Sequence, residues 1–294
     1  MLEYKNIEAL AKVVQEKGFE RAARVLFLTQ SAVSQRIRQL EDSCGQILLS
    51  RTTPPTPTSA GKALLKHYQQ VRLLEEGLSS ELSAAATVST LAIGINADSL
   101  AHWFIAAIGP ILQKMNILLD LRVDDQEETH RYLREGDVVG CITTEANAIQ
   151  GCRVEKLGTI NYRLLATPDF IDLWFPQGFS LKPAQRAPAV IFNRRDRLHY
   201  QFFETFLGSC PESFAAHYIP SPGQFFEVIA AGYSYGMVPD WQGRRLLNAG
   251  QLKELLPGRV LPINLYWHCW NLDAQPLREF SDQLLAGAQR AMSE

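Results

Sequence analysis

The alternation of apolar and polar positions near the N-terminus predicts two short helices joined by a tight turn. The second carries Val33, Ile37 and Leu40 at spacings of four and three, so these side chains share one helical face. Thr29 is a suitable N-cap, because its hydroxyl can accept a hydrogen bond from a backbone N–H of the first turn. Gly45 can end the helix in the left-handed conformation, which glycine adopts at low cost. The pattern therefore predicts a capped helix with one face suited to a protein core.

The opposite side of this helix has the side chains that a DNA-reading surface needs. In a helix-turn-helix motif the second helix must pack on its neighbours and also present donors and acceptors to base edges in the major groove. Side chains on the polar face are predicted to read bases, and the backbone near Thr29 is predicted to hold a phosphate. An ordinary amphipathic helix pair is the alternative. The candidate DNA contacts here are Thr29, Gln30, Ser31, Ser34, Gln35 and Arg38.

The neighbouring segments complete a small domain. A first helix is predicted over about 6–17, and residues 46–51 have the pattern of a short strand. The segment 52–57 is predicted to be a stiff turn, because each of its prolines fixes φ and lacks an N–H donor. Arg51, at the junction of the strand and the turn, is a candidate phosphate contact.

A long helix is predicted to follow, from Thr58 to about Ser83. Its apolar residues recur at spacings of three and four, which makes a seam long enough to pair with a second copy of the chain. Packing of this helix on its own domain is the alternative, and residues 83–89 are predicted to be a hinge. The seam consists of Leu64, Tyr68, Val71, Leu74, Leu78 and Leu82.

From residue 90 onward, strand-like and helix-like segments alternate. Strands separated by helices predict an α/β domain with a mainly parallel sheet. Helices are expected near 99–115, 127–134 and 275–291. Strands are expected near 91–95, 117–123, 138–143, 188–192, 215–219, 234–238 and 261–267.

The turns that follow the strands of this domain are candidate ligand sites, since ligands of such sheets bind beyond the carboxyl ends of the strands. A ligand carboxylate is expected at Ser99 and Thr143, where helix N-termini present free N–H groups. The acidic residues near the strand ends could receive a cationic side chain, and together they favour a zwitterion with an extra positive charge. The candidate ligand contacts are Asn96, Asp98, Ser99, Asp124, Asp125, Thr143, Thr144 and Glu145.

The distribution of charge is more informative than the net charge of −2. Residues 1–72 carry eleven Lys/Arg against six Asp/Glu, whereas residues 73–294 carry eighteen against twenty-five. A basic N-terminal part on an acidic remainder is typical of a protein that attracts DNA at one end. A solvated face would give the same asymmetry, so the charge supports the helix-turn-helix prediction without establishing it.

Other classes of function have little support. The five cysteines have wide, unrelated spacings, which favours reduced thiols in a cytoplasm over disulfides. Charged residues near the N-terminus rule out a signal-peptide core, and the apolar runs are too short to span a bilayer. The six histidines have no zinc-ligand spacing, and no phosphate loop or nucleophile elbow is present. We therefore expect a cytoplasmic protein with no metal, no cofactor and no enzymatic activity.

The N-terminal segment resembles the DNA-binding domain of the LysR-type transcriptional regulators. Leu49 stands where the family usually has phenylalanine, and the tip of the 52–57 turn lacks the basic residue that many members carry. The residues that match the family pattern are Ala22-Ala23, Leu26, Gln30-Ser31, Ser34, Ile37, Leu40-Glu41, Gly45, Leu48, Arg51, Thr58 and Gly61.

The resemblance implies an α/β fold with a winged helix-turn-helix at 1–58, a linker and dimerisation helix with its hinge at 59–89, and an effector domain at 90–294. Pro54 and Pro55 would lie in the wing, beside or in the minor groove. The effector domain would have two lobes around a cleft, like a periplasmic solute-binding protein. The first lobe would hold about 90–163 with 267–294, and the second about 164–266.

A subgroup of the family matches further. The segment from Asn96 to Ala101, followed by Trp103, is similar to the regulators that respond to lysine and arginine, also described as inhibitors of chromosome replication initiation. Divergence is concentrated near 170–225, where Asn193-Arg194-Arg195 occupies a position expected to be more acidic. Further matches are Gly18 to Ala23, Pro54-Pro55 before Thr58, Val138-Val139-Gly140 and Tyr266-Trp267-His268.

The resemblance therefore implies a regulator that binds operator DNA as a homodimer or homotetramer and responds to lysine or arginine, with genes of amino-acid transport or metabolism as targets. RNA polymerase is a candidate partner, and no membrane is involved. Alternatives are a LysR-type regulator for a different small effector, a cytoplasmic solute-binding module, and a cysteine-based redox sensor of the kind found in some members of the family.

Overall fold

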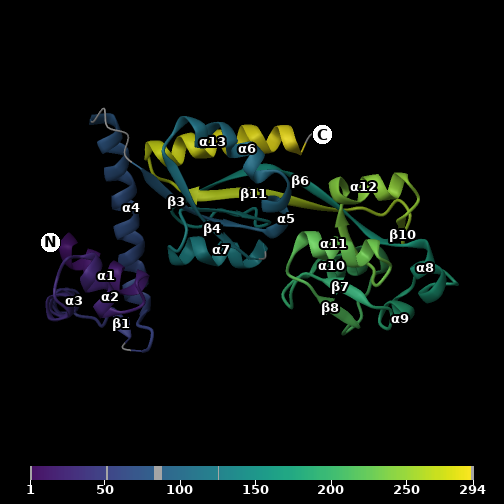
Figure 1. Ribbon diagram of the computed structural model, residues 1–294, viewed down its shortest axis with the longest axis horizontal. Coiled ribbons are helices and arrows are strands. Elements are labelled where there is room, and N and C mark those ends of the chain that lie inside the picture. The colour runs from purple at the N-terminus through teal and green to yellow at the C-terminus, as the bar shows by residue number, and fades with distance from the viewer. Residues whose placement is uncertain (1, 51, 83–87, 125, 293–294) are drawn as a thin grey trace.

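The computed structural model describes residues 2–50, 52–82, 88–124 and 126–292, and it has three parts in chain order (Figure 1). A small N-terminal head leads into one long helix, and an elongated α/β body follows. Arg51, Asp125 and most of the predicted hinge at 83–89 lie outside the described residues. The head and the long helix consist of α1 (Tyr4–Gln15), α2 (Phe19–Val25), α3 (Gln30–Cys44), β1 (Leu49–Ser50), β2 (Thr56–Pro57) and α4 (Ser59–Leu82).

The helix-turn-helix forms as its sequence pattern predicts. The backbone N–H of Ala32 donates to Thr29 Oγ1 over 3.2 Å and caps α3, and Gly45 ends the helix at a φ of 66°. Val33, Ile37 and Leu40 are buried in the core of the head against α1 and α2. Burial of each such side chain contributes about 1.5–3 kcal/mol. Because these apolar side chains face the core, the polar face of α3 is the one that remains exposed to a binding partner.

The wing predicted after α3 is a short antiparallel pair, in which Leu49 of β1 lies opposite Pro57 of β2. The Glu41 carboxylate near the end of α3 accepts hydrogen bonds from the backbone N–H groups of Leu48, at 2.9 Å, and Leu49, at 3.3 Å. A Cβ atom on Gly61 would lie 2.0 Å from the carbonyl oxygen of Leu48, so only glycine fits there. These contacts fix the wing relative to both α3 and α4.

The apolar seam predicted on α4 has two parts in the structure. Leu64 and Tyr68 pack against the core of the head. For this first part of the seam, the alternative prediction that the helix packs on its own domain is therefore correct. Leu74, Leu78 and Leu82 are 40%, 55% and 79% exposed. The second half of the seam is therefore not covered by the described residues of its own chain.

The body alternates strands and helices over most of its length. Its first half consists of β3 (Ser89–Ile95), α5 (Ala97–His102), α6 (Phe104–Lys114), β4 (Ile117–Val123), α7 (Gln126–Glu135), β5 (Gly140–Thr143), β6 (Cys152–Ala166), α8 (Pro168–Trp174) and α9 (Leu181–Ala184). Its second half consists of β7 (Ala189–Ile191), α10 (Leu198–Leu207), β8 (Ala216–Tyr218), α11 (Pro222–Ala230), β9 (Gly236–Pro239), α12 (Asp240–Asn248), β10 (Lys253–Glu254), β11 (Leu261–Trp270) and α13 (Gln275–Ala291).

The prediction of a mainly parallel sheet was wrong. Parallel pairing does join β3 to β4 and β5, and β7 to β8. The larger sheet has the order β10-β6-β11-β5-β3-β4, with β9 also paired to β6, and both neighbours of β11 run antiparallel to it. The error has a local cause, since the 15-residue strand β6 was not predicted at all. Its burial does not alternate regularly, so neither strand periodicity nor a continuous apolar run marks it.

Strands β6 and β11 run along most of the body and pass from one lobe into the other (Figure 1). The lobe boundaries predicted at 163/164 and 266/267 fall inside these two strands. The ladder between them shifts its register between Leu265 and Tyr266, and such a bulge increases the local twist of a strand pair. Both lobes are therefore joined by continuous, hydrogen-bonded strands.

The helix predicted over 99–115 is interrupted at Trp103, which ends α5 and precedes α6. The φ and ψ of Trp103, −112° and −27°, depart from helical values, and its indole is buried in the core. The kink directs α5 and α6 along different paths. The helix predicted at 275–291 is confirmed as α13, and the strands predicted near 91–95 and 117–123 are confirmed as β3 and β4.

Helices cover both faces of the sheet in the first lobe, with α6 and α13 on one side and α7 on the other (Figure 1). The α6–α13 contact is close at Gly287, where an added Cβ would lie 2.5 Å from both the Cα and the Cβ of Ala107. The backbones of the two helices thus approach each other directly, which positions α6 and the preceding α5 beside the sheet.

We predict that Gly287→Ala destabilises the protein by about 1–3 kcal/mol, because overpacking forces the α6–α13 contact apart. Gly223→Ala is the matched control, since a Cβ there meets nothing within 4 Å in the described structure. Urea unfolding of the two variants measures the difference. Equal stability of both variants would contradict the close helix contact.

Candidate functional site

The exposed face of α3 and the wing form one candidate site. Gln30, Ser34 and Arg38 from α3 line a groove together with Thr52, Thr53 and Pro55 from the wing. Thr29, Ser31 and Gln35 are exposed on the same helix or its cap, and Pro54 is exposed in the wing without lining the groove. Of the predicted DNA contacts, the structure brings Gln30, Ser34, Arg38 and Pro55 together around the groove.

The groove also has a contribution that the sequence analysis missed. Lys17, at a φ of 52°, and Arg21 at the start of α2 also line it. The Arg21 guanidinium donates to the carbonyl oxygen of Lys17 over 2.8 Å, which holds it beside the groove. The sequence signal for this contribution is the pair of basic residues at the end of the turn and the start of α2, outside the helix from which the DNA contacts were predicted.

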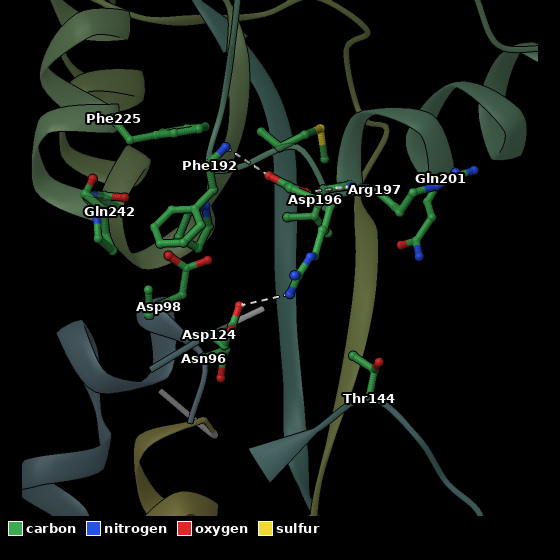
Figure 2. Close-up of a pocket in the computed structure, with 16 residues that line it drawn as sticks. Asn96, Asp98, Asp124, Thr144, Phe192, Asp196, Arg197, Gln201, Phe225 and Gln242 are labelled. Carbon is green, nitrogen blue, oxygen red and sulfur yellow. Dashed lines mark hydrogen bonds and ion pairs between the residues drawn. The ribbon is translucent and has the colours of Figure 1, made fainter. Parts of the chain in front are cut away.

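The second candidate site is a cleft between the lobes of the body (Figure 2). Lobe I lines it with the turn after β3 and with residues that follow β4 and β5. Lobe II lines it with the loop between β7 and α10 and with parts of α11, β9 and α12. Its polar lining consists of Asn96, Asp98, Asp124, Thr144, Arg195, Asp196, Arg197, Gln201 and Gln242.

Asp98 lies in the first turn of α5 and is directed into the cleft (Figure 2). The phenol of Tyr162, on β6, donates to Asp98 Oδ2 over 2.6 Å. Burial raises the pKa of Asp98, the Tyr162 hydrogen bond lowers it in part, and the charge of Asp196 raises it further. The site therefore holds a carboxylate whose charge is costly unless a cation binds beside it.

Asp196 supplies a second carboxylate from lobe II. The backbone N–H of Leu198 donates to its Oδ1 over 2.9 Å, and that of Phe192 donates to its Oδ2 over 3.2 Å. Burial raises the pKa of Asp196 despite these two hydrogen bonds. Asp196 was not among the predicted ligand contacts, although it follows the strand predicted near 188–192. The rule that was applied to the strand ends of lobe I would have identified it.

Asp124, which follows β4, is the third carboxylate of the cleft. The phenol of Tyr132, on α7, donates to its Oδ2 over 2.7 Å. From lobe II the guanidinium of Arg195 approaches Asp124, with 3.9 Å between Nη1 and Oδ1 (Figure 2). A further contact between the lobes is the stacking of His102 on Trp241, whose ring centroids lie 4.1 Å apart. Among the described residues, the lobes thus meet through an ion pair across the cleft and through a ring stack outside its lining.

The other predicted ligand contacts have different surroundings. Asn96 is buried and lines the cleft, and no described residue hydrogen-bonds to its Oδ1. Thr144 also lines the cleft, whereas Glu145 is exposed outside it. Ser99 and Thr143 are buried inside lobe I, where Thr143 Oγ1 accepts a hydrogen bond from the N–H of Glu145. The side chains expected to meet a ligand carboxylate therefore do not line the cleft.

The described residues contain no group of three or more His, Cys, Asp or Glu side chains arranged to hold a metal ion. No helix within these residues is both long enough and apolar enough to cross a membrane.

We predict that Asp98→Asn stabilises the unliganded protein at neutral pH. The substitution keeps an acceptor for Tyr162 and removes a buried charge. The pKa of Asp98 is raised in the folded state, so the folded protein binds a proton at this carboxyl more tightly than the unfolded chain does. Loss of that proton therefore lowers the stability of the fold as the pH rises through the folded pKa. The gain from the substitution should therefore shrink as the pH falls toward the ordinary carboxyl range.

Thermal unfolding at pH 7.5 and pH 5 would measure this difference. Asp172→Asn, at an exposed position of α8, is the control that removes the same charge from the surface. A gain for Asp98→Asn that is the same at both pH values would contradict the role of burial.

Two family models match the chain. Residues 4–62 match the bacterial regulatory helix-turn-helix protein, lysR family, and residues 84–289 match the LysR substrate binding domain. The chain is 43% identical over 291 residues to the HTH-type transcriptional regulator ArgP of Pseudomonas aeruginosa, covering 98% of this chain and 96% of the relative.

Two solved structures are similar over the full length. ArgP from Mycobacterium tuberculosis has a TM-score of 0.89 and 35% identity, covering 98% of each chain. Full-length LysG from Corynebacterium glutamicum, solved with bound effector Arg, has a TM-score of 0.81 and 30% identity, covering 99% of each chain.

Proposed function

Because the chain belongs to the LysR family of bacterial transcriptional regulators, we propose that a basic amino acid, arginine or lysine, controls its binding to operator DNA. The observation that carries this proposal is the acidic cleft. Asp98, Asp124 and Asp196 reach it from both lobes, and cationic groups of a ligand would offset the cost of burying these charges. The arginine bound to LysG supports the same class of ligand.

At the other end of the chain, the surface of α3 is suited to reading DNA. We assign base contacts to Gln30, Ser34, Gln35 and Arg38, since their side chains can donate and accept at the major-groove edges. The backbone near Thr29 would hold a phosphate, as would Arg51, and the prolines of the wing would lie near the minor groove. Lys17 and Arg21 extend this basic surface along the groove.

In a homo-oligomer, the DNA-binding heads of two copies could bind the same operator. Two copies that pair through the exposed seam of Leu74, Leu78 and Leu82 would present two recognition helices to a two-fold symmetric operator. Effector binding can change transcription only if the effector has a higher affinity for one arrangement of the lobes or subunits than for another.

Calorimetric titration of the full-length protein with L-arginine and L-lysine tests the effector. Saturable binding of at least one is the expected result. No heat with either, together with binding of an aromatic or dicarboxylic acid, would replace the proposed effector with a different one and leave the family assignment unchanged. A solute-binding protein without regulatory function would bind ligand but fail to shift its own upstream DNA at low salt in a mobility-shift assay.

We predict that Arg38→Ala costs about 1–3 kcal/mol on the specific operator and much less on random DNA, because a base contact distinguishes sequences and a phosphate contact does not. Fluorescence anisotropy with the two DNAs measures both affinities. Arg278→Ala is the control, since it removes an exposed charge from α13, far along the chain from the head. Equal losses on both DNAs would exclude Arg38 from base recognition.

A further inference from the structure

Arg195 has a defined place in the cleft. It belongs to the loop between β7 and α10, and its guanidinium faces Asp124 of the opposite lobe, with 3.9 Å between Nη1 and Oδ1 (Figure 2). The side chain is 59% exposed, against 25% for Asp124. A ligand that enters the cleft therefore meets this guanidinium while it is still accessible from solvent.

The backbone that carries Arg195 is held by its neighbours. Asn193 Oδ1 accepts hydrogen bonds from the N–H groups of Arg195, at 2.7 Å, and Asp196, at 3.0 Å. This is the local turn that asparagine side chains commonly form. The Asp196 carboxylate then accepts hydrogen bonds from Phe192 and Leu198 on either side of the loop. These hydrogen bonds hold the loop in one conformation, and a loop held in this way binds a ligand at a lower entropic cost.

Arg195 differs from its basic neighbours in what it faces. The guanidinium of Arg197 lies over the ring of Tyr200, 4.9 Å from its centroid, and that of Arg194 lies over Tyr218 at 4.6 Å. Both are thus placed against aromatic rings of lobe II, and Arg194 does not line the cleft. Arg195 instead faces a carboxylate of lobe I.

When Arg195 is included, the cleft has a group of opposite charge for each charged group of a basic amino acid. Such a ligand carries two cationic groups and one carboxylate. Asp98, Asp124 and Asp196 can accept the cations, but the carboxylate needs a donor. The side chains first expected to supply one, Ser99 and Thr143, do not line the cleft. A guanidinium is the donor best suited to a carboxylate, because its planar fork can form two parallel hydrogen bonds.

We propose that Arg195 binds the α-carboxylate of the effector and exchanges its contact with Asp124 for this one, while Asp124 accepts the α-ammonium group. This inference rests on the proposed function, since it assumes an amino-acid effector. The ion pair with Asp124 is long, at 3.9 Å, and half-exposed, so it is weak, whereas a guanidinium and a carboxylate in direct contact form strong charge-assisted hydrogen bonds. Specificity follows for ligands with an intact carboxylate over the corresponding amines.

L-arginine and agmatine test this assignment, because agmatine keeps the guanidinium and one amine but lacks the carboxylate. Calorimetry on the full-length wild-type protein and Arg195→Ala would give four affinities. We expect the substitution to weaken L-arginine binding by about tenfold to a hundredfold, the range of hydrogen bonds to charged groups. Agmatine binding should not weaken, so the preference for L-arginine over agmatine should fall by at least the same factor.

Two further variants separate recognition from general charge or misfolding. Arg194→Ala removes the same charge from the adjacent residue and should retain the wild-type preference. Arg195→Lys keeps a cation without the fork and should recover part of the lost affinity. Thermal unfolding of each variant checks that the fold is intact.

Equal losses for L-arginine and agmatine in Arg195→Ala, unchanged L-arginine binding, or tighter L-arginine binding would each overturn the assignment. A wild-type protein that binds neither L-arginine nor L-lysine would overturn the proposed function instead, and the role of Arg195 with it.

Discussion

The antiparallel pairing of β6 with β11 is the constraint on which the arrangement of both lobes depends. Both strands pass from one lobe into the other, and both contribute buried residues to the one large core of the body. The lobes can therefore change their relative orientation by twisting a hydrogen-bonded ladder rather than by separating at a flexible loop. The bulge near Leu265 is a place where the twist is already increased. The cleft takes residues from both lobes, so its width depends on the twist of that ladder.

The electrostatics of the cleft follow from this geometry. Asp98 and Asp196 come from opposite lobes, and the charge of Asp196 contributes to the raised pKa of Asp98. Repulsion between these groups opposes closure, whereas the contact of Arg195 with Asp124 favours it. A cationic ligand between the carboxylates would convert a repulsive pair into two attractive contacts. In the described structure, the carboxylates of the cleft therefore carry an electrostatic cost that a cationic ligand would reduce.

The parts of this structure that could be predicted from the sequence are those set by local chemistry. The cap at Thr29, the ending at Gly45 and the buried stripe of α3 depend on residues within about four positions of each other, and all were predicted. The strand-end rule found Asp98 and Asp124. The rule could not show that Ser99 faces the interior of lobe I. The orientation of α5 depends on the burial of Trp103 among residues that are distant in the chain. Strand β6 was missed because it has neither strand periodicity nor a continuous apolar run, and it is held by partners, β9 to β11, that are remote in the chain.

Helix α7 connects two regions that the sequence separates widely. Its ten residues begin beside Asp124 and end at Glu135, which forms an ion pair with Lys62 on α4 over 2.7 Å. Tyr132 ties the same helix back to Asp124, and Lys62 lies four positions after Thr58, where the wing joins α4. A helix of this length is a stiff rod of about 15 Å. Through Tyr132 and Glu135, this one helix therefore joins a carboxylate of the cleft to the segment that follows the wing.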